Sequence, residues 1–398
     1  MGNKHSGDKR SKKVSGSKPS PQAAALQPAT ASQPDTVSTA LDDSMAASKV
    51  ALVVGKGVIG RSVVEYLDPL KEEWSAIKIL ATSQPDFATR ATVVKVDLLD
   101  ATSCGSSLGG GAIKDVTHVF FCGLAPGGTD DVEKNVLMLK NVVDSVDKNC
   151  PELQRILLNE GLKYYGVHLG KFKTPAKEDD ARVLGPMFYY DQEDYMREAA
   201  VGKSWDWVAI RPDVVCGYAF GQMNLVVIIA IYCVICKELN LPLRFPGKAG
   251  CFDKLAQVCY APHLAKACTW AITETSAAGE AYNVVNGDFF RWETVWPKFA
   301  KYFGMEWAGV GTVNLTEMMA DKGPVWDSIV KKYGLKDTPL EKLCVWGFGD
   351  WCWGAEFDIM ASSTKIRQAG FTDTVDSEDM FFKMFDDFAA MGIIPKQK

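Results

Sequence analysis

Short runs of apolar residues alternate with amphipathic stretches from residue 49 onward. We expect the short runs to be β-strands, because polar or glycine-rich turns bound them. They are Val50–Val54, Ile77–Ala81, Thr92–Val96, His118–Cys122, Ile156–Asn159 and Trp207–Ile210. Between two of these runs, Val132–Val146 repeats apolar residues at helical spacing. Strands that alternate with helices predict an α/β fold built on a Rossmann-type, doubly wound parallel sheet covered on both faces.

The pattern changes after about residue 220, where helical periods and tryptophans become more frequent. This change predicts a mostly helical lobe over residues 221–398 that packs on the sheet. The longest apolar run, Met223–Cys236, is shorter than the roughly 20 residues of a membrane helix, so we predict a soluble fold. Cys233 and Cys236 form a C-x-x-C within this run. Packing of a buried helix is favoured there over a redox pair or half a metal site.

Residues 1–48 have a different composition, rich in Ser, Ala, Pro, Gln and Lys and without an aromatic residue. Such a segment buries too little apolar surface to offset the entropy of ordering, so we expect a disordered tail. It begins MGNKHS, which matches the myristoylation pattern with Gly2 as the acceptor, and a basic cluster follows. A plastid transit segment is the alternative, because the tail has few acidic residues.

The overall composition excludes some classes of function. The 398 residues carry a formal net charge of −5, which does not favour nucleic-acid binding. The eleven cysteines are scattered and odd in number, so they are interpreted as free thiols in a reducing compartment. The four histidines are far apart in the sequence and lack ligand spacing, so no metal site is predicted.

A glycine-rich turn follows the first predicted strand. Gly55-Lys56-Gly57-Val58-Ile59-Gly60 leads into a predicted helix over residues 61–66. Glycines in such a turn let a pyrophosphate approach the backbone at the helix N-terminus. Although a purely structural turn is the alternative, its place after the first strand of an alternating pattern favours dinucleotide binding. Residues 49–220 are therefore predicted to be an NAD(P)-binding Rossmann domain.

The end of the second strand indicates which dinucleotide binds. NAD enzymes place an acid there against the ribose hydroxyls, whereas this chain has Thr82 and Ser83. Their hydroxyls can donate to a 2′-phosphate, so we predict NADP(H), with NAD(H) as the alternative. Arg61 and Arg90 are candidate partners for that phosphate. Asp97, which follows the third strand, is expected on the adenine side.

A second glycine motif, Gly105–Gly109, formally matches the G-x-S-x-G elbow of serine hydrolases. That elbow needs a strand directly before it and a helix directly after it. Polar residues precede the match here and more glycines follow it, so we expect a flexible loop instead.

Candidate catalytic groups are two adjacent tyrosines, Tyr189 and Tyr190. Many Rossmann-type reductases pair a tyrosine with a lysine four residues later, but here those positions are Glu193 and Asp194. Lys163 lies just past the end of the fifth strand, where ligands gather in such sheets. The lysine and a tyrosine from a later segment can therefore come from two separate loops.

The chain resembles the progesterone 5β-reductase/iridoid synthase family, an atypical branch of the short-chain dehydrogenases/reductases. The resemblance covers about residues 49–395, with the extended architecture of that family. The motifs that carry it are Val116–Phe120, Asn149–Leu153, Gly161–Tyr165, Phe188–Asp194, Arg211–Pro212, Met223–Leu225, Ile235–Lys237, Phe245–Gly247, Tyr282–Asp288 and Trp346–Asp350.

The resemblance implies that Tyr189 and Lys163 are the catalytic pair. It also implies cofactor contacts beyond the glycine turn, at Leu98, Gly123, Asn159, Val215, Gln222 and Met223. The chain departs from the family in its shorter glycine loop and in Thr82 and Ser83, which replace paired arginines. Around the substrate, Leu124 replaces a tryptophan, His168 corresponds to a phenylalanine, and Phe348 is retained, which predicts a pocket of altered shape and polarity.

The activity that the resemblance implies is NADPH-dependent 1,4-reduction of enones, whether steroid-like, monoterpenoid-like or small. Two alternatives stay open: a short-chain oxidoreductase of carbonyls and alcohols, and a non-catalytic, membrane-tethered NADP sensor. The expected partners are a small enone, a membrane surface contacted through a myristoylated tail, and a second copy in a dimer. The expected location is cytoplasmic, with membrane association through Gly2.

Overall fold

A seven-stranded parallel sheet forms the centre of the computed structural model, which describes residues 48–126, 128–219 and 223–397. Its strands are β1 (Lys49–Val54), β2 (Trp74–Ala81), β3 (Thr92–Lys95), β4 (His118–Phe121), β5 (Arg155–Asn159), β6 (Asp206–Pro212) and β11 (Ala281–Val284). Every neighbouring pair is parallel, in the order β11-β6-β5-β4-β1-β2-β3. The Rossmann-type architecture predicted from the alternating pattern is confirmed.

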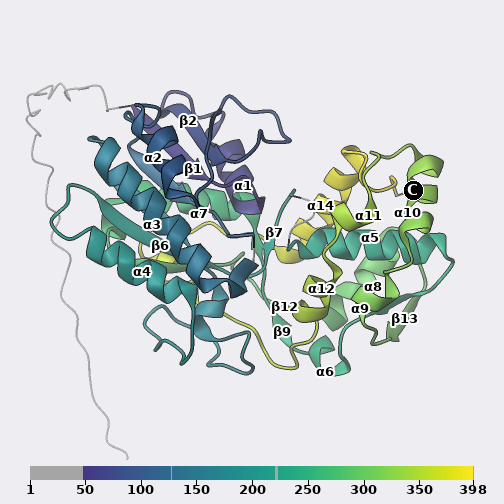
Figure 1. The fold of residues 1–398 in the computed structure, drawn as a ribbon. Coiled ribbons are helices and arrows are strands. Elements are labelled where there is room, and N and C mark those ends of the chain that lie inside the picture. The colour runs from purple at the N-terminus through teal and green to yellow at the C-terminus, as the bar shows by residue number, and fades with distance from the viewer. Residues whose placement is uncertain (1–47, 127, 220–222, 398) are drawn as a thin grey trace, which may run out of the picture. The chain divides into compact units, whose positions relative to one another are not determined.

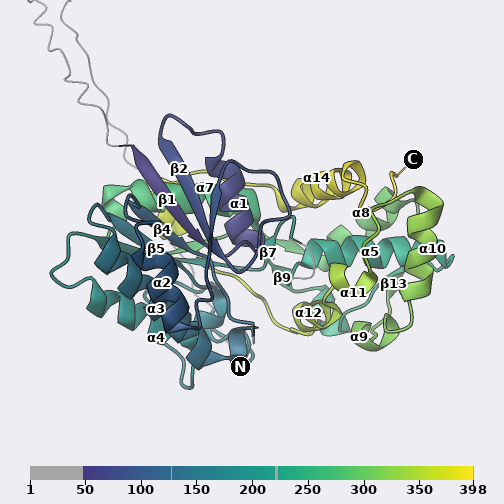
Figure 2. The same ribbon diagram turned by 45° about the horizontal axis from the view of Figure 1, so that its top comes forward.

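Helices cover both faces of this sheet (Figures 1 and 2). One face carries α1 (Val58–Leu67) and α7 (Ala261–Thr273), and the other carries α2 (Ala101–Gly109), α3 (Val132–Asn149) and α4 (Phe188–Ala199). Strand side chains alternate between two apolar cores. Leu52 and Val54 pack toward the core of α2 and α3, while Ala51 and Val53 pack toward that of α1 and α7. Burial on both faces explains why these strands read as continuous apolar runs.

Two predictions of local structure need correction. Residues 105–109 belong to α2, because Asp100 caps this helix by accepting from Thr102 N and because Cys104 and Leu108 are buried on its inner face. The sheet also extends beyond the predicted range of 49–220, since β11 adds a seventh strand and α7 covers one face. With only four residues, β11 is too short to be recognised within a stretch of mostly helical pattern.

Most of the chain after residue 223, apart from α7 and β11, forms a lobe around α5 (Leu225–Glu238), which is buried from Leu225 to Cys236 (Figure 1). Trp296, Trp326 and Trp353 lie inside the core of this lobe. Its other helices are α6 (Ala249–Phe252), α8 (Trp292–Phe303), α9 (Leu315–Met318), α10 (Gly323–Tyr333), α11 (Leu340–Leu343), α12 (Trp346–Cys352) and α14 (Ser377–Ala390). None of the helices in the described residues has both the length and the hydropathy of a membrane span.

The remaining elements are short. They are β7 (Val215–Cys216), β8 (Leu243–Phe245), β9 (Leu255–Ala256), β10 (Cys259–Tyr260), β12 (Phe290–Arg291), β13 (Trp307–Val310), η1 (Gly128–Asp130), η2 (Leu162–Tyr165), η3 (Thr275–Ala277) and α13 (Thr364–Gln368). All eleven cysteines are free thiols, and Cys233 and Cys236 are buried on α5, as the pattern predicted. Gly2 and Gln222 lie outside the described residues, as does the predicted tail apart from residue 48.

Candidate active site

A cavity of about 570 Å³ lies at the carboxyl ends of the strands. The strand order reverses between β1 and β4, and ligands of doubly wound sheets bind beside such a switch point. The structure brings most of the predicted site residues together here. Those that line this cofactor cavity are Gly55, Lys56, Gly57, Val58, Thr82, Asp97, Leu98, Gly123, Leu124, Asn159, Tyr189, Val215, Met223 and Phe348.

The glycine turn has the geometry that a pyrophosphate needs. A β-carbon at Gly60 would lie 2.2 Å from the carbonyl oxygen of Gly55, so only glycine allows this close approach of helix and turn. Gly57 is the N-cap of α1, and no side chain caps the helix there. The first N–H groups of α1 therefore remain available beside the cavity, and an anion is the ligand that they favour.

Thr82 and Asp97 lie at the expected adenosine end of the cavity. Thr82 lines it, whereas Ser83 is exposed and does not. Arg90 donates to four backbone carbonyl oxygens between residues 67 and 75, so its guanidinium holds the β2 region together. Arg61 donates to Glu65 and to the carbonyl oxygen of Tyr218. Neither arginine points a free guanidinium toward a 2′-phosphate, contrary to our expectation for this pair.

The two adjacent tyrosines differ in their hydrogen bonding. The hydroxyl of Tyr190 donates to the carbonyl oxygen of Tyr164 and accepts from Val183 N at 2.9 Å. Tyr189 lies in the first turn of α4, is 8% exposed, and makes no hydrogen bond with any described residue. Burial and the nearby Glu160 raise the pKa of Tyr189, so its hydroxyl stays protonated as a donor. Only Tyr189 is thus free to serve a ligand.

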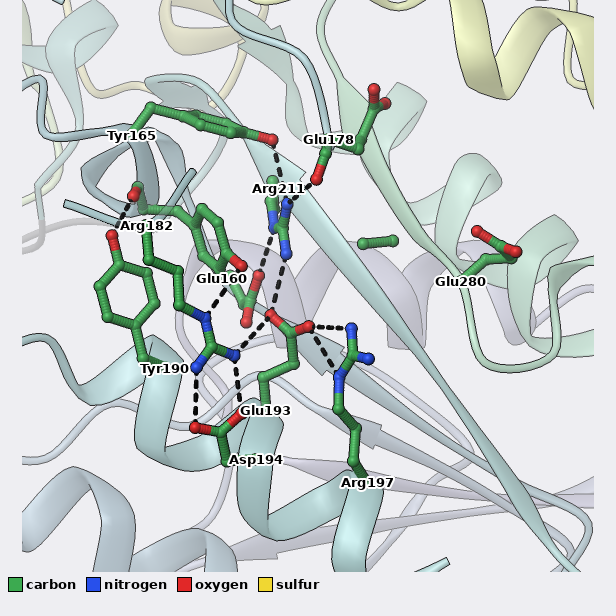
Figure 3. Close-up of polar contacts among 12 residues, drawn as sticks. Glu160, Tyr165, Glu178, Arg182, Tyr190, Glu193, Asp194, Arg197, Arg211 and Glu280 are labelled. Carbon is green, nitrogen blue, oxygen red and sulfur yellow. Dashed lines mark hydrogen bonds and ion pairs between the residues drawn. The ribbon is translucent and has the colours of Figure 1, made fainter. Parts of the chain in front are cut away.

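A buried ion network fixes the helix that carries Tyr189 (Figure 3). Glu193 occupies the position four residues after Tyr189 and accepts from Arg211 Nη2 at 2.9 Å. Arg211 Nε donates in turn to Glu160 at 2.6 Å, and all three side chains are at most 1% exposed. Because Arg211 is on β6 and Glu160 directly follows β5, the network ties α4 to the edge of the sheet where the cavity opens.

Lys163 lies on η2 and does not line the cofactor cavity. Its Nζ donates to Thr129 Oγ1 at 2.5 Å and lies 3.3 Å from Asp130 Oδ1. Thr129 lines the same cavity as Tyr189, so Lys163 reaches the site through this hydroxyl and makes no direct hydrogen bond with Tyr189. A catalytic pair of Tyr189 and Lys163 stays a prediction.

A second cavity, of about 360 Å³, adjoins the first. His168 lines this second cavity and not the cofactor cavity, while Asp213 lines both. Burial raises the pKa of Asp213 to about 7, against the opposing hydrogen bond from Val214 N. Burial and the charge of Lys163 lower the pKa of His168, whose imidazole is therefore mainly neutral at pH 7. Of the predicted substrate residues, Leu124 and Phe348 face one cavity and His168 the other.

Some residues of the site were missed at the sequence level, namely Thr129, Glu160, Gly161 and Asp213. Glu160, Gly161 and Asp213 directly follow the ends of β5 and β6, so the rule that ligands gather beyond the strand ends could have found them. Thr129 follows β4 at a longer interval. A β-carbon at Gly161 would lie 3.1 Å from the hydroxyl oxygen of Tyr189, which explains a glycine here. No pattern in the sequence indicates that contact.

Within the described residues, no group of three or more His, Cys, Asp or Glu side chains is arranged to hold a metal ion. The donors around the cofactor cavity include backbone N–H groups, hydroxyls and the side chain of Lys56, which suit a phosphate-bearing organic cofactor.

Comparison with solved structures supports the fold. A UDP-glucose 4-epimerase of Thermus thermophilus, solved in complex with NAD, superimposes with a TM-score of 0.57 over 85% of this chain and 98% of the epimerase chain. A short-chain dehydrogenase/reductase superfamily protein of Agrobacterium tumefaciens, with bound NAD, gives 0.58 over 86% and 98%. Their sequence identities to this chain are 17% and 13%, so the likeness is one of fold.

Curated sequences show a much closer relationship. An (S)-8-oxocitronellyl enol synthase of Nepeta racemosa is 35% identical over 370 residues, which cover 87% of this chain and 93% of the synthase. A short chain dehydrogenase of Penicillium aethiopicum is 31% identical over 379 residues, covering 87% of this chain and 100% of the dehydrogenase. The sequence profile of the PRISE-like Rossmann-fold domain matches residues 96–395. This chain therefore belongs to the PRISE-like Rossmann-fold family, which confirms the resemblance to progesterone 5β-reductase and iridoid synthase.

Proposed function

We propose that this chain is an NADPH-dependent reductase of activated carbon–carbon double bonds, which carries out the 1,4-reduction of enones. Its relatives among the enol synthases and short chain dehydrogenases support an NAD(P)-dependent oxidoreductase. The observation that carries the proposal is the hydroxyl of Tyr189, protonated and without a hydrogen-bond partner among the described residues. It lines the cavity that begins at the glycine turn.

The residues of the site can stabilise the charge that this reaction develops. NADPH held along the glycine turn would supply the hydride for the β-carbon of the enone, and negative charge would then develop on the carbonyl oxygen of the substrate. Tyr189 donates a hydrogen bond to that oxygen, and the bond strengthens as the oxygen becomes negative. A proton taken up at the α-carbon completes the saturated ketone. Lys163, held by Thr129, adds positive charge at the edge of the cavity.

One feature of the relatives favours enone reduction over carbonyl reduction. The Nepeta racemosa protein is named for forming an enol, which is the protonated form of the species that 1,4-hydride addition creates. A carbonyl reductase would instead have to deliver a proton to an alkoxide. A sensor without catalytic activity needs no unpaired tyrosine hydroxyl in the cofactor cavity, so Tyr189 argues against that alternative.

The first test is the identity of the product. We expect the purified protein to oxidise NADPH in the presence of cyclohexenone and to yield cyclohexanone. Chromatography of the reaction mixture distinguishes this ketone from the allylic alcohol. Formation of the allylic alcohol alone would assign the enzyme to carbonyl reduction.

The second prediction concerns the preference for NADPH over NADH. NADPH should bind more tightly than NADH, because Thr82 offers a hydroxyl and no acid lies beside the 2′ position. The difference should stay within about tenfold, since Arg61 and Arg90 are both engaged by protein groups. Fluorescence titration of both cofactors measures it. In a matched variant, Thr82→Asp, the added carboxylate should reverse the order, and tighter NADH binding by the unaltered protein would refute the prediction.

Membrane attachment is proposed on the sequence of the N-terminus alone. One myristoyl chain gives an association constant of only about 10⁴ M⁻¹, so the basic cluster of the tail would supply a second signal of about 1 kcal/mol per residue. We expect Gly2→Ala to release the protein from membranes in cell fractionation while its kinetics stay unchanged. Rising salt should have a similar effect on the unaltered protein. Recovery from plastids of a protein cleaved near residue 45 would favour a transit peptide.

A further inference from the structure

The second cavity is a mostly apolar chamber beside the cofactor cavity. Leu225, Val258, Trp292, Phe357 and Ile359 are among the residues that line it. Its volume of about 360 Å³ falls in the range of about 300–1,000 Å³ that is usual for ligand sites. Such a lining suits a hydrocarbon skeleton.

The two cavities share one wall. Phe348 and Trp351, both on α12, stack with ring centroids 5.9 Å apart and planes 12° apart. Phe348 lines the cofactor cavity and Trp351 lines the second cavity. At the end of β6, Pro212 lines the first cavity, Val214 lines the second, and Asp213 between them lines both. A substrate that extends beyond its reacting double bond would therefore pass Asp213.

Two polar atoms on the second cavity lack hydrogen-bond partners. Asp213 Oδ1 accepts from Val214 N at 2.7 Å, but Asp213 Oδ2 is buried without a partner among the described residues. His168 Nδ1 is buried and unpaired in the same way. Buried polar atoms are nearly always paired in folded proteins, so each such exception needs a ligand, a water or another explanation. Both residues belong to the lining of this one cavity.

Other polar side chains of this lining already have partners. Gln257 accepts from Ala361 N at 2.7 Å, and Asp350 accepts from Leu315 N at 2.7 Å. Lys248 and Lys254 are partly exposed and lie near Glu356 and Asp253 respectively. The lining carries two lysines and two aspartates, so it has no formal net charge that would favour a charged ligand. A neutral hydroxyl fits better, because it can donate to Asp213 Oδ2 and accept from the ring N–H of a neutral His168.

We propose that the two cavities together bind the substrate, with Asp213 and His168 holding a hydroxyl group of its apolar skeleton in the second cavity. This inference rests on the proposed enone reduction in the cofactor cavity, and it narrows the substrate class to hydroxylated, extended enones. Asp213 and His168 are then the specificity-determining residues, whereas Tyr189 acts on the reacting carbonyl.

A matched pair of substrates tests this inference in the full-length protein. Each is a cyclohexenone with a flexible alkyl chain, which ends in a hydroxyl in one compound and in a methyl group in the other. We expect kcat/KM to favour the hydroxylated compound by about tenfold, as for one hydrogen bond, with most of the difference in KM. Equal values of kcat/KM would overturn the inference, since the unpaired atoms would then hold only water.

Variants of the two residues provide the second comparison. Asp213→Leu and His168→Phe should each reduce the preference for the hydroxylated compound to about twofold or less, because each removes one polar partner. Asp213→Asn should also lose most of the preference, because its single amide oxygen is needed to accept from Val214 N and its NH2 group then replaces the acceptor that faces the cavity. Thermal unfolding checks that each variant is folded. An equal loss of kcat/KM on both compounds would indicate general damage to the site and would count against the inference.

A measurement of ligand binding tests this inference without depending on the proposed enone reduction. The saturated ketones of the same pair cannot react at a double bond, and calorimetry measures their binding to the protein loaded with NADP⁺. We expect the hydroxylated ketone to bind about tenfold more tightly than its methyl counterpart, and Asp213→Leu to abolish this difference. That result would support the hydroxyl site even if the protein reduced no enone. Equal binding of the two ketones would refute the site whatever the kinetics.

Discussion

Replacing Tyr189 with phenylalanine is expected to lower turnover by about tenfold to a thousandfold, because it removes a donor that acts in the transition state. Binding of NADPH and the melting temperature should change little, since this hydroxyl makes no hydrogen bond with the described residues. Steady-state kinetics with cyclohexenone, together with a fluorescence titration of NADPH, measure both effects.

Tyr190→Phe is the matched control. It removes the same atom from the neighbouring residue, but that hydroxyl bridges Tyr164 O and Val183 N. We therefore expect a loss of about 1–3 kcal/mol in the free energy of unfolding and a smaller loss of turnover than in Tyr189→Phe. If Tyr190→Phe were the variant with the lower turnover, the assignment of the two tyrosines would be reversed.

The sequence predicted the parts of this fold that leave a local pattern. Six strands of the sheet are present at their predicted places, because strands buried on both faces are continuous apolar runs. The glycine turn was found because the backbone beside a pyrophosphate requires glycines. The strand β11 was missed because its four residues lie in a stretch whose pattern is mostly helical and rich in aromatic residues. Only its pairing with β6 in three dimensions identifies it as a strand.

The site was predicted less completely than the fold. Tyr189 was chosen over Tyr190 by resemblance, and only the structure gives a physical reason for that choice in their different hydrogen bonding. The partner of Lys163, Thr129, lies 34 residues away, a distance that no local pattern reports. The second cavity is formed by segments from residue 167 to residue 359, so its unpaired atoms become visible only in three dimensions.

Arg211 is the residue whose removal should destabilise the protein most. Its guanidinium joins Glu160 to Glu193, donates to Tyr165 Oη at 3.2 Å and lies 3.4 Å from the ring centre of Tyr164 (Figure 3). Arg211→Met would leave two buried carboxylates without their shared cation. Loss of one partner from such a pair costs about 3–5 kcal/mol, which denaturation by urea should detect.

Arg197→Ala is the control, because Arg197 pairs with the same Glu193 but its side chain is 54% exposed. Solvent screens that pair, so the expected loss is about 0–1 kcal/mol. Replacing Glu160 by glutamine should restore part of the stability of Arg211→Met at pH 8, since it removes the buried carboxylate that loses its cation, whereas Glu193 still pairs with Arg197. Similar losses in Arg211→Met and Arg197→Ala would contradict the central place of Arg211 in the network.

The cost of Arg211→Met should also depend on pH. Burial raises the pKa of Glu160 to about 7, and the charge of Arg211 opposes this shift. A carboxyl group whose pKa is higher in the folded state holds its proton there after the unfolded chain has lost it. Stability from this group therefore falls as pH rises from the unfolded pKa of about 4.3 to about 7.

Without Arg211 the folded pKa of Glu160 rises further, and the fall in stability continues to higher pH. The difference in unfolding free energy between Arg211→Met and the unaltered protein should thus be larger at pH 8 than at pH 5. Urea denaturation of both proteins at the two pH values measures it. A difference independent of pH would show that Glu160 is ionised in both proteins, or that its ionisation does not depend on Arg211.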